Sequence, residues 1–417
     1  MNVQPSIPRQ PSESRSTLLG LLTQACELEH GLACSYLYAA FSLKQDLAEG
    51  GMTWQDLQRA RLWAAQIYFV AAEEMLHLAQ VWNLLAAIGG TPYYLRPNFP
   101  LPTDYYPLNI SIVLERFSLA TLDRFIQFEK PADVTLMPEA SIIGAAGPGF
   151  DTIGELYGMV AHLVTRIPEE QLFIGGGTQV GTDLVDFPNI VKVSNRESAL
   201  AAVSLITEQG EGIKADRGDS HFGMFRGVRT TYLEELARAN REDREFQPVR
   251  ACISNPVATL SPVLGSVGGQ AITNPSTAQV ADCFDSVYGL MLRLLQYVFD
   301  HSTSDEDVMR DFSRSSLELM TSTLKPLGEA LTAMPAGEEY EGQTAGPGFV
   351  LTRHVPLPRH PVAARILALE KFDELTVRLR RAAALTNPEP PPQVARAADS
   401  ISATASRLRQ AGAIASQ

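Results

Sequence analysis

One long amphipathic segment limits the fold of this chain more than any other feature. Between Thr53 and Ile88, apolar residues recur at spacings of three and four, which is the period of one helical face. Thr53 and Asp56 have the spacing of a capping box, and the sequence GGTP that follows Ile88 is a helix stop signal. Such a helix would be about 54 Å long. A helix of this length packs its apolar face against other helices, so the segment predicts a helical bundle.

Two polar residues interrupt the apolar face of this helix near its middle. Glu74 and His77 occupy positions on the stripe that otherwise carries residues such as Val70 and Val81. A spacing of three residues directs both side chains to the same side of a helix. Since an unpaired buried carboxylate costs several kcal/mol, these groups need a partner inside the bundle. A metal ion would satisfy both side chains.

Other predicted helices carry polar residues at matching positions. A helix from about Thr17 to Leu43 has Glu29 on its apolar stripe, and Tyr36 lies two turns further along. In the next part of the chain, Glu155 is followed by His162 on the same helical face. The stripes therefore predict Glu29 and Glu155 as metal ligands. We expect Tyr36 and His162 to lie beside the metal, where they would orient a ligand or contact substrate.

The last two predicted ligands come from a divided motif. Glu211 ends a predicted helix, but position 214, where a histidine at i+3 would complete the pair, holds Lys214. His221 follows at the head of the next predicted helix, as if a short loop had been inserted between the two ligands. Glu208 lies on an equally good apolar stripe, so it is an alternative to Glu211.

Six residues then form the predicted site, with two carboxylates and one imidazole in each half of the chain. An oxygen-rich site with two nitrogen donors suits iron or manganese better than zinc or copper. Bridging carboxylates can hold two cations about 3.5–4 Å apart. We therefore expect two iron ions, with manganese as the alternative in one or both positions, and nothing in the sequence requires a haem. The six ligands are Glu29, Glu74, His77, Glu155, Glu211 and His221.

Composition excludes several other functions. The 417 residues contain 34 Lys+Arg and 47 Asp+Glu, a net charge of −13, which argues against binding a nucleic-acid backbone. No apolar run approaches the ~20 residues of a membrane-spanning helix. The polar N-terminus does not resemble a secretory signal, and the four cysteines form no CxxC pair. These features predict a cytoplasmic protein without a nucleic-acid or membrane partner.

The predicted fold class is all-α: a four-helix bundle extended by C-terminal helices. No stretch with the period of a strand stands out, and a helix from Ile110 to Glu129 supplies part of the bundle. The final helix is amphipathic and would dock on the body or on a second copy, so a homodimer is one of the assemblies we consider. The expected regions are a tail at 1–16, the bundle at 17–245, a helical extension at 246–387, and a Pro-rich linker with a tail helix at 388–417.

Several motifs resemble those of ferritin-like di-iron carboxylate proteins. Glu29 to Tyr36 followed by Glu74-Met75-Leu76-His77 is similar to the first half of a bacterioferritin or rubrerythrin bundle. The order of ELEH (27–30), TIGELY (152–157), EQGEG (208–212), DSHF (219–222) and AGPGF (345–349) resembles the iminophenyl-pyruvate dimer synthases of violacein and rebeccamycin biosynthesis. The resemblance extends from about residue 17 to 385. It implies a ferritin-like bundle and an iron-dependent oxidative role, with the six ligands named above.

The expected function is therefore a dinuclear-iron oxidoreductase that uses O2 or peroxide on a small organic substrate of specialised metabolism. A Pro/Tyr-rich segment at 92–107 and the C-terminal region would shape the substrate pocket. One alternative is an iron-binding or ferroxidase protein without an organic substrate. Another is a peroxide-detoxifying protein that uses the same site.

Overall fold

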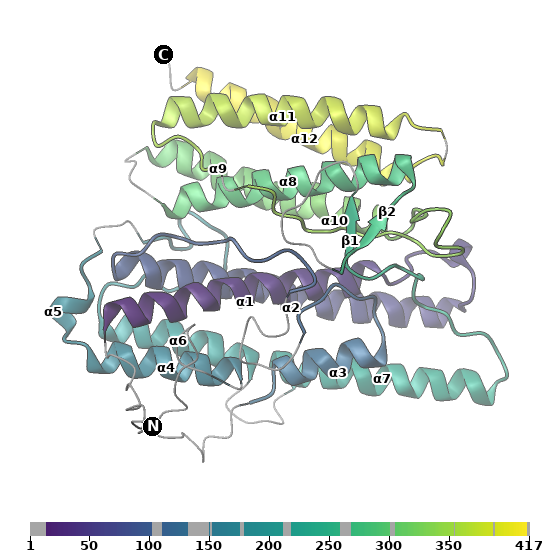
Figure 1. The fold of residues 1–417 in the computed structure, drawn as a ribbon, viewed down its shortest axis with the longest axis horizontal. Coiled ribbons are helices and arrows are strands. Elements are labelled where there is room, and N and C mark those ends of the chain that lie inside the picture. The colour runs from purple at the N-terminus through teal and green to yellow at the C-terminus, as the bar shows by residue number, and fades with distance from the viewer. Residues whose placement is uncertain are drawn as a thin grey trace, which may run out of the picture.

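The all-α fold class predicted from the sequence is confirmed by the computed structural model. Helices account for nearly all regular structure in the described part of the chain (Figure 1). Of the expected N-terminal tail, positions 1–13 lie outside the described residues. The structure describes residues 14–101, 111–131, 150, 152–175, 179–211, 218–258, 268–300, 305–353, 355–386 and 388–414.

Two long helices form the middle layer of the molecule. Helix α1 (Arg15–Phe41) and helix α2 (Trp54–Ala87) pack against each other along their lengths, joined through the short 3-10 helix η1 (Leu47–Glu49). The capping box predicted at the start of α2 is present: the Asp56 backbone N–H donates to Thr53 Oγ1 at 3.2 Å, and the Thr53 N–H donates to Asp56 Oδ2 at 2.9 Å. This pair fixes where α2 begins.

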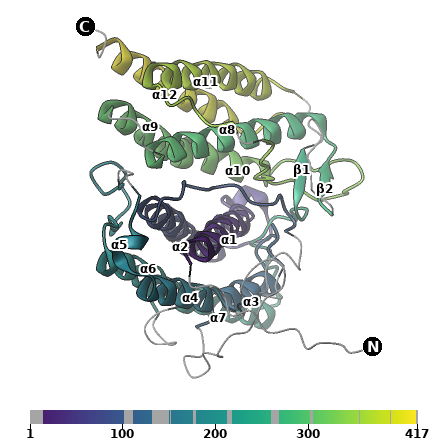
Figure 2. The ribbon, with the colours of Figure 1, turned by 60° about the vertical axis from the view of Figure 1, so that its left-hand side comes forward.

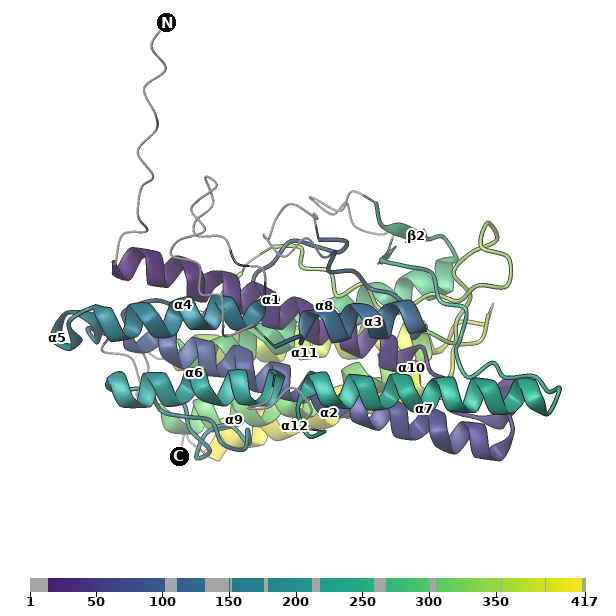
Figure 3. The same cartoon turned by 90° about the horizontal axis from the view of Figure 1, so that it is seen from below.

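The third and fourth helices of the bundle are each divided in two. Figures 1 and 3 show α3 and α4 lying end to end, and α6 and α7 likewise. Together they cover one side of the α1–α2 pair, and a single-turn helix, α5, follows α4. Each break falls halfway along the bundle, which brings helix ends to its centre. The bounds are α3 Leu119–Phe128, α4 Ile153–Arg166, α5 Glu169–Leu172, α6 Arg196–Gly210 and α7 His221–Arg241.

The predicted helix from Ile110 is wrong in its first part, because α3 begins only after Ser118. The Ser118 side chain caps α3 by accepting from the Thr121 N–H at 3.0 Å. Before the cap, the backbone of Leu114 pairs with Asn255 instead: its N–H donates to Asn255 Oδ1 at 2.8 Å, and its carbonyl accepts from the Asn255 N–H at 2.9 Å. A distant partner therefore takes the hydrogen bonds that a helix would need.

The C-terminal helices cover the other side of the α1–α2 pair (Figure 2). A short parallel strand pair, β1 (Pro256–Ala258) and β2 (Gln270–Ile272), precedes them. Each strand has only three residues, which is too short for a strand period to show in the sequence. A π-helical turn divides the helical stretch between Glu306 and Leu331. The helices are α8 Pro275–Phe299, α9 Glu306–Glu318, the π turn η2 Leu319–Leu324, α10 Lys325–Leu331, α11 Pro361–Ala383 and α12 Pro392–Ile414.

The last helix docks on the body of the molecule rather than standing apart from it. Helix α12 packs along α11 and also contacts η2 and α10. Its backbone is tied to α11 by Arg365, whose Nη1 donates to the Leu408 carbonyl at 2.9 Å. Thr404 Oγ1 donates to Glu318 of α9 at 3.0 Å. Among the described helices, none combines the length and apolar character needed to cross a bilayer.

Arg250 joins the bundle to the C-terminal helices. Its guanidinium donates to both oxygens of Glu49, at 2.6 and 2.9 Å. The same group donates to the Phe41 carbonyl at 2.8 Å and to Thr332 Oγ1 at 3.0 Å. Because one buried cation connects the end of α1, η1 and the segment after α10, it fixes the relative position of the two parts.

Candidate metal centre

Glu74 lies at the centre of a buried polar cluster in the bundle. Its Oε2 is 3.1 Å from His77 Nδ1, one turn further along α2. Its Oε1 is 2.9 Å from Nδ1 of His221, the first residue of α7. All three residues are at most 2% exposed, and one donor atom of each lies within 4.8 Å of the others. A single carboxylate therefore lies between two imidazoles, with one oxygen facing each.

Two further carboxylates flank the two histidines, one beside each imidazole. Glu29, midway along α1, has Oε2 3.6 Å from His77 Nδ1. Glu129, at the C-terminal cap of α3, has Oε2 3.6 Å from His221 Nδ1. Both glutamates are buried. The cluster thus consists of two similar halves, each with one histidine and one glutamate, which share Glu74.

A tyrosine holds the outer oxygen of each flanking carboxylate. The Tyr157 hydroxyl donates to Glu29 Oε1, and the Tyr36 hydroxyl donates to Glu129 Oε1. Burial and the neighbouring carboxylates raise the pKa of both phenols well above the usual value, so both remain protonated donors. Each bond leaves Oε2 of its glutamate directed toward the histidine of the same half.

A chain of hydrogen bonds connects the far sides of the two imidazoles. His77 Nε2 lies 3.0 Å from Gln209 Oε1, and Gln209 Nε2 donates to Glu73 Oε1 at 3.0 Å. Glu73 Oε2 in turn lies 3.0 Å from His221 Nε2. Two acceptors therefore fix both Nε2 atoms as N–H donors, which leaves the Nδ1 atoms available to the centre of the cluster.

Charges within the cluster perturb one another strongly. Burial, followed by repulsion from Glu74, raises the pKa of Glu29 to about 7. Burial lowers the pKa of the histidines, but the carboxylates outweigh it: Glu74 and Glu29 raise the pKa of His77 to about 10, and Glu74, Glu129 and Glu73 raise that of His221. The cluster therefore favours positive charge between its carboxylates, whether from imidazolium protons or from bound cations.

A fourth carboxylate reaches the cluster where α6 ends. Glu211, the C-terminal cap of α6, lines the same small cavity as Glu29, Glu74 and His77. The cavity has a volume of about 20 Å³. Gly154, in the first turn of α4, makes room for this side chain, because a Cβ there would lie 1.7 Å from Glu211 Oε1. The glycine thus cradles a carboxylate at the edge of the site.

These residues fit metal binding by their donor chemistry, and one donor atom each of Glu74, His77 and His221 also lies within 4.8 Å of the others. The cluster offers four carboxylates and two imidazole nitrogens, the donor set that iron and manganese take in helical bundles. His221 Nδ1 is buried without a hydrogen bond of acceptable geometry, although Glu74 Oε1 is only 2.9 Å away. Such a contact is expected where a nitrogen and an oxygen point at a common cation rather than at each other.

Five of the six predicted ligands come together in the structure: Glu29, Glu74, His77, Glu211 and His221. The exposed side chain of Glu208 lies outside the cavity lining, so the geometry favours Glu211 over this alternative. The divided motif reflects a real break, because α6 ends at Gly210 and α7 starts at His221.

The structure does not bring Glu155 or His162 to the cluster, contrary to the prediction. The face of α4 turned toward the cavity carries Gly154 and Tyr157, which are three residues apart. Glu155 is rotated about 100° from Gly154 on the helix and is only partly buried. His162 lies about 140° from Tyr157 and is exposed.

Several site residues were missed by sequence reasoning, and one of them could have been found. Glu129 continues the buried stripe of Leu122 and Phe125 at the end of α3, so it carries the same signal as Glu29. Tyr157 could be confused with ordinary core. Gln209 reaches the site through a contact between helices that helical periodicity does not encode.

Comparison with known proteins finds a family profile and several similar proteins. A sequence profile described as ferritin-like matches residues 22–230. Dichlorochromopyrrolate synthase from Lentzea aerocolonigenes is 28% identical over 410 residues, covering 88% of this chain and 39% of that protein. A 2-imino-3-(indol-3-yl)propanoate dimerase from Chromobacterium violaceum is 29% identical over 356 residues, covering 80% of this chain and 34% of that protein.

The crystal structure of a ferritin-like protein from Caulobacter vibrioides is 20% identical, with a TM-score of 0.44, and covers 74% of this chain and 96% of that one. The chain spans less than two-fifths of the length of the two sequence relatives described above.

Proposed function

The chain belongs to the ferritin-like family, as its motifs predicted, and on that premise we propose that it is a dinuclear-iron oxidoreductase. We propose that it uses O2 or peroxide to oxidise a small organic molecule. One observation carries the proposal: Glu74 lies between His77 and His221, with a flanking carboxylate on each side. This two-halved arrangement provides a matching set of donors for two cations.

The proposed ligands divide between the two halves of the cluster. His77 and Glu29 would hold one ion, His221 and Glu129 the other, and Glu74 would contact both. Glu211 would complete the set from the end of α6. We therefore replace the predicted Glu155 by Glu129. Bound iron would supply the redox chemistry with O2 or peroxide.

The surrounding residues would keep these donors in place. Tyr36 and Tyr157 would hold Glu129 and Glu29 by hydrogen bonds to their outer oxygens. Gln209 and Glu73 would keep both histidines in the tautomer with a free Nδ1. In the middle of a buried bundle, the same residues exclude bulk water from the carboxylates, which strengthens their attraction for cations.

The names of the relatives support an organic substrate. One is named a dichlorochromopyrrolate synthase and the other a 2-imino-3-(indol-3-yl)propanoate dimerase. We propose that this chain acts on a small substrate of the same broad kind in specialised metabolism. Because it spans only 39% and 34% of those proteins, this assignment is a proposal about the shared part.

The size of the cavity favours a second candidate function, oxidation of iron without an organic substrate. A volume of about 20 Å³ beside the carboxylates holds about one water molecule and no organic molecule. This volume is measured between residues that the structure describes. A ferroxidase needs access only for iron and O2.

Oxygen consumption separates the two functions. Protein loaded anaerobically with Fe(II) is mixed with aerated buffer, with and without 2-imino-3-(indol-3-yl)propanoate generated in situ. We expect sustained O2 uptake only with the organic compound, and its loss in Glu74→Ala together with metal binding. Uptake that stops after the bound iron is oxidised, regardless of the compound, supports the ferroxidase. Unchanged turnover in Glu74→Ala refutes both.

A further inference from the structure

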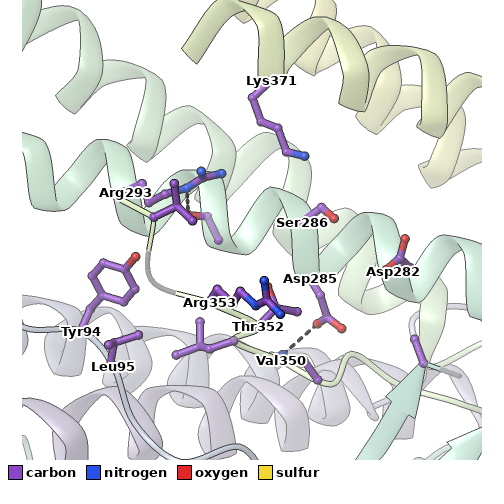
Figure 4. Close-up of a pocket in the computed structure, with 14 residues that line it drawn as sticks. Tyr94, Leu95, Asp282, Asp285, Ser286, Arg293, Val350, Thr352, Arg353 and Lys371 are labelled. Atoms are coloured by element: carbon purple, nitrogen blue, oxygen red, sulfur yellow. Dashed lines mark hydrogen bonds between the residues drawn. The ribbon is translucent and has the colours of Figure 1, made fainter. Parts of the chain in front are cut away.

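A second cavity, of about 350 Å³, opens among the C-terminal helices. It shares no lining residue with the cavity at the metal site. One face of α8 forms its floor, because Asp282, Asp285, Ser286, Gly289 and Arg293 follow one another at spacings of one, three or four residues. The cleft between this face, α11 and residues 350–353 and 355 is shown in Figure 4.

Cationic side chains gather around this cleft. Arg293 is partly buried, and its Nε donates to the Gly289 carbonyl at 3.1 Å. Among the residues that the structure describes, no carboxylate lies within 4.0 Å of Arg293 or of Arg353. Figure 4 shows Lys371 reaching from α11 toward the same space, and the Tyr94 hydroxyl facing the Arg293 end. Burial lowers the pKa of Arg293, so its charge is poorly solvated.

The acidic residues around the cleft neutralise only part of this charge. Lys371 is paired with Glu374 of α11, at 2.8 Å. Asp282 is already paired with Arg378 of α11. Asp285 accepts a hydrogen bond from the Val350 N–H at 3.0 Å, and burial raises the pKa of this carboxyl to about 8. It is therefore mostly protonated at neutral pH. Arg293 and Arg353 therefore make the cleft a locally positive site in a chain with a net charge of −13.

Apolar surface fills the remainder of the cleft. Leu95, Val350 and Leu351 line it together with Gly289, whose missing side chain leaves the α8 surface open. A Cβ built on Gly289 meets nothing within 4 Å. The volume lies within the ~300–1,000 Å³ range of small-molecule sites. An aromatic or aliphatic group would be covered by these residues while its charged end faced Arg293.

We propose that this cleft binds a small organic acid, with its carboxylate paired to Arg293 and its apolar body lying over Gly289. A guanidinium matches the two oxygens of a carboxylate in a planar, bidentate arrangement, and it attracts such a group more strongly where water is partly excluded. Phosphate alone would leave the apolar wall uncovered. No residue of this binding site belongs to the metal centre, so the proposal goes beyond the function proposed for that centre.

Part of this cleft was expected from the sequence. Residues 92–107 and the C-terminal region were predicted to shape a pocket, and Tyr94 and Leu95 do line a cleft with α8 and α11. Residues 102–107 lie outside the described part of the chain. Within the described residues, this segment therefore lines the second cavity and contributes nothing to the lining of the cavity at the metal ligands.

Titration calorimetry with a matched pair of probes tests the proposal. Phenylacetate and its uncharged analogue phenylacetamide are titrated into the full chain, into Arg293→Gln and into Gly289→Leu. Arg310→Gln serves as the control, because Arg310 is an exposed arginine that pairs with Glu306 on α9. The iron content of each variant is measured in parallel.

We expect phenylacetate to bind the full chain with a Kd of about 1 mM or below, and phenylacetamide at least about tenfold more weakly. Arg293→Gln should lose at least about tenfold in affinity for the acid. Gly289→Leu should abolish binding of both probes by filling the cleft. Arg310→Gln should bind as the full chain does, and iron content should not change in any variant.

Equal affinity for acid and amide, wild-type binding by Arg293→Gln and Gly289→Leu, or no binding of phenylacetate at all would each overturn the proposal. These outcomes are distinct from failure of the proposed function, which would appear as absent iron in the full chain while the acid still bound.

Discussion

Replacing Gly154 by alanine separates helix stability from metal binding. A Cβ at this position would lie 1.7 Å from Oε1 and 2.6 Å from Cδ of Glu211. Because such contacts do not fall below 3.0 Å, the carboxylate oxygen must move by more than about 1 Å. Metal–ligand distances tolerate only about 0.2 Å, so Glu211 would no longer be in place to bind.

Two opposing magnitudes follow from this change. Alanine is the better helix former by up to about 1 kcal/mol. The unfolding free energy of the metal-free variant should therefore fall, at most, by the cost of moving one flexible side chain. Displacing a metal-site carboxylate should weaken binding at that position by about 10- to 100-fold, or about 1.4–2.7 kcal/mol. Stability and metal affinity should therefore change independently.

Gly227→Ala provides the matched control. Gly227 lies within α7, where an added Cβ meets nothing within 4 Å. This substitution should raise the unfolding free energy by about 0.5–1 kcal/mol and leave metal binding unchanged. Thermal unfolding of the metal-free proteins and competition titrations with a chelator measure the two quantities. If Gly154→Ala binds two metal ions as tightly as Gly227→Ala does, Glu211 is not a ligand.

Three further substitutions test separate parts of the structure. Glu129→Gln should lose at least one metal ion per chain while Glu155→Gln keeps the parent stoichiometry, as measured by elemental analysis; the opposite result would restore the ligand predicted from the sequence. Tyr36→Phe removes only the hydroxyl that holds Glu129, so chelator competition should show about a tenfold loss of affinity in a normally folded protein, and unchanged affinity would show that the bond is not needed. Burial alone would raise the pKa of Glu49, but hydrogen bonds from Arg250 lower this pKa below the usual value. The Glu49–Arg250 pair therefore stabilises the fold at neutral pH, and this stabilisation is lost as the pH falls through the lowered pKa. Glu49→Gln should thus reduce the unfolding free energy by about 2 kcal/mol at pH 7 and by much less at a pH below that lowered pKa, and a difference in denaturant titrations that does not change with pH would contradict this.

Much of the fold could be predicted because its helices are long and strongly periodic. The limits of α2 follow from the capping box at Thr53 and the glycines after Ile88, both of which act locally. The start of α3 could not be predicted in the same way. Its preceding backbone pairs with Asn255, a residue far away in the sequence whose position only the tertiary fold determines.

The site could be predicted where each ligand lies on a long helix, as Glu29, Glu74 and His77 do. The prediction failed at α4, because this helix is too short for its sequence to show which face is buried. A rotation of about 100° separates Glu155 from the face that carries Gly154 and Tyr157. The partners of the outer hydrogen-bond chain, such as Gln209, depend on packing between helices and leave no periodic signal.

Iron stoichiometry tests the central claim most directly. The chain is loaded anaerobically with isotopically enriched Fe(II), freed of unbound metal, and examined by elemental analysis and Mössbauer spectroscopy before and after exposure to air. The two-halved cluster around Glu74 predicts two irons per chain, magnetically coupled to each other after oxidation. One iron or none per chain, or two irons without coupling, would contradict the dinuclear centre.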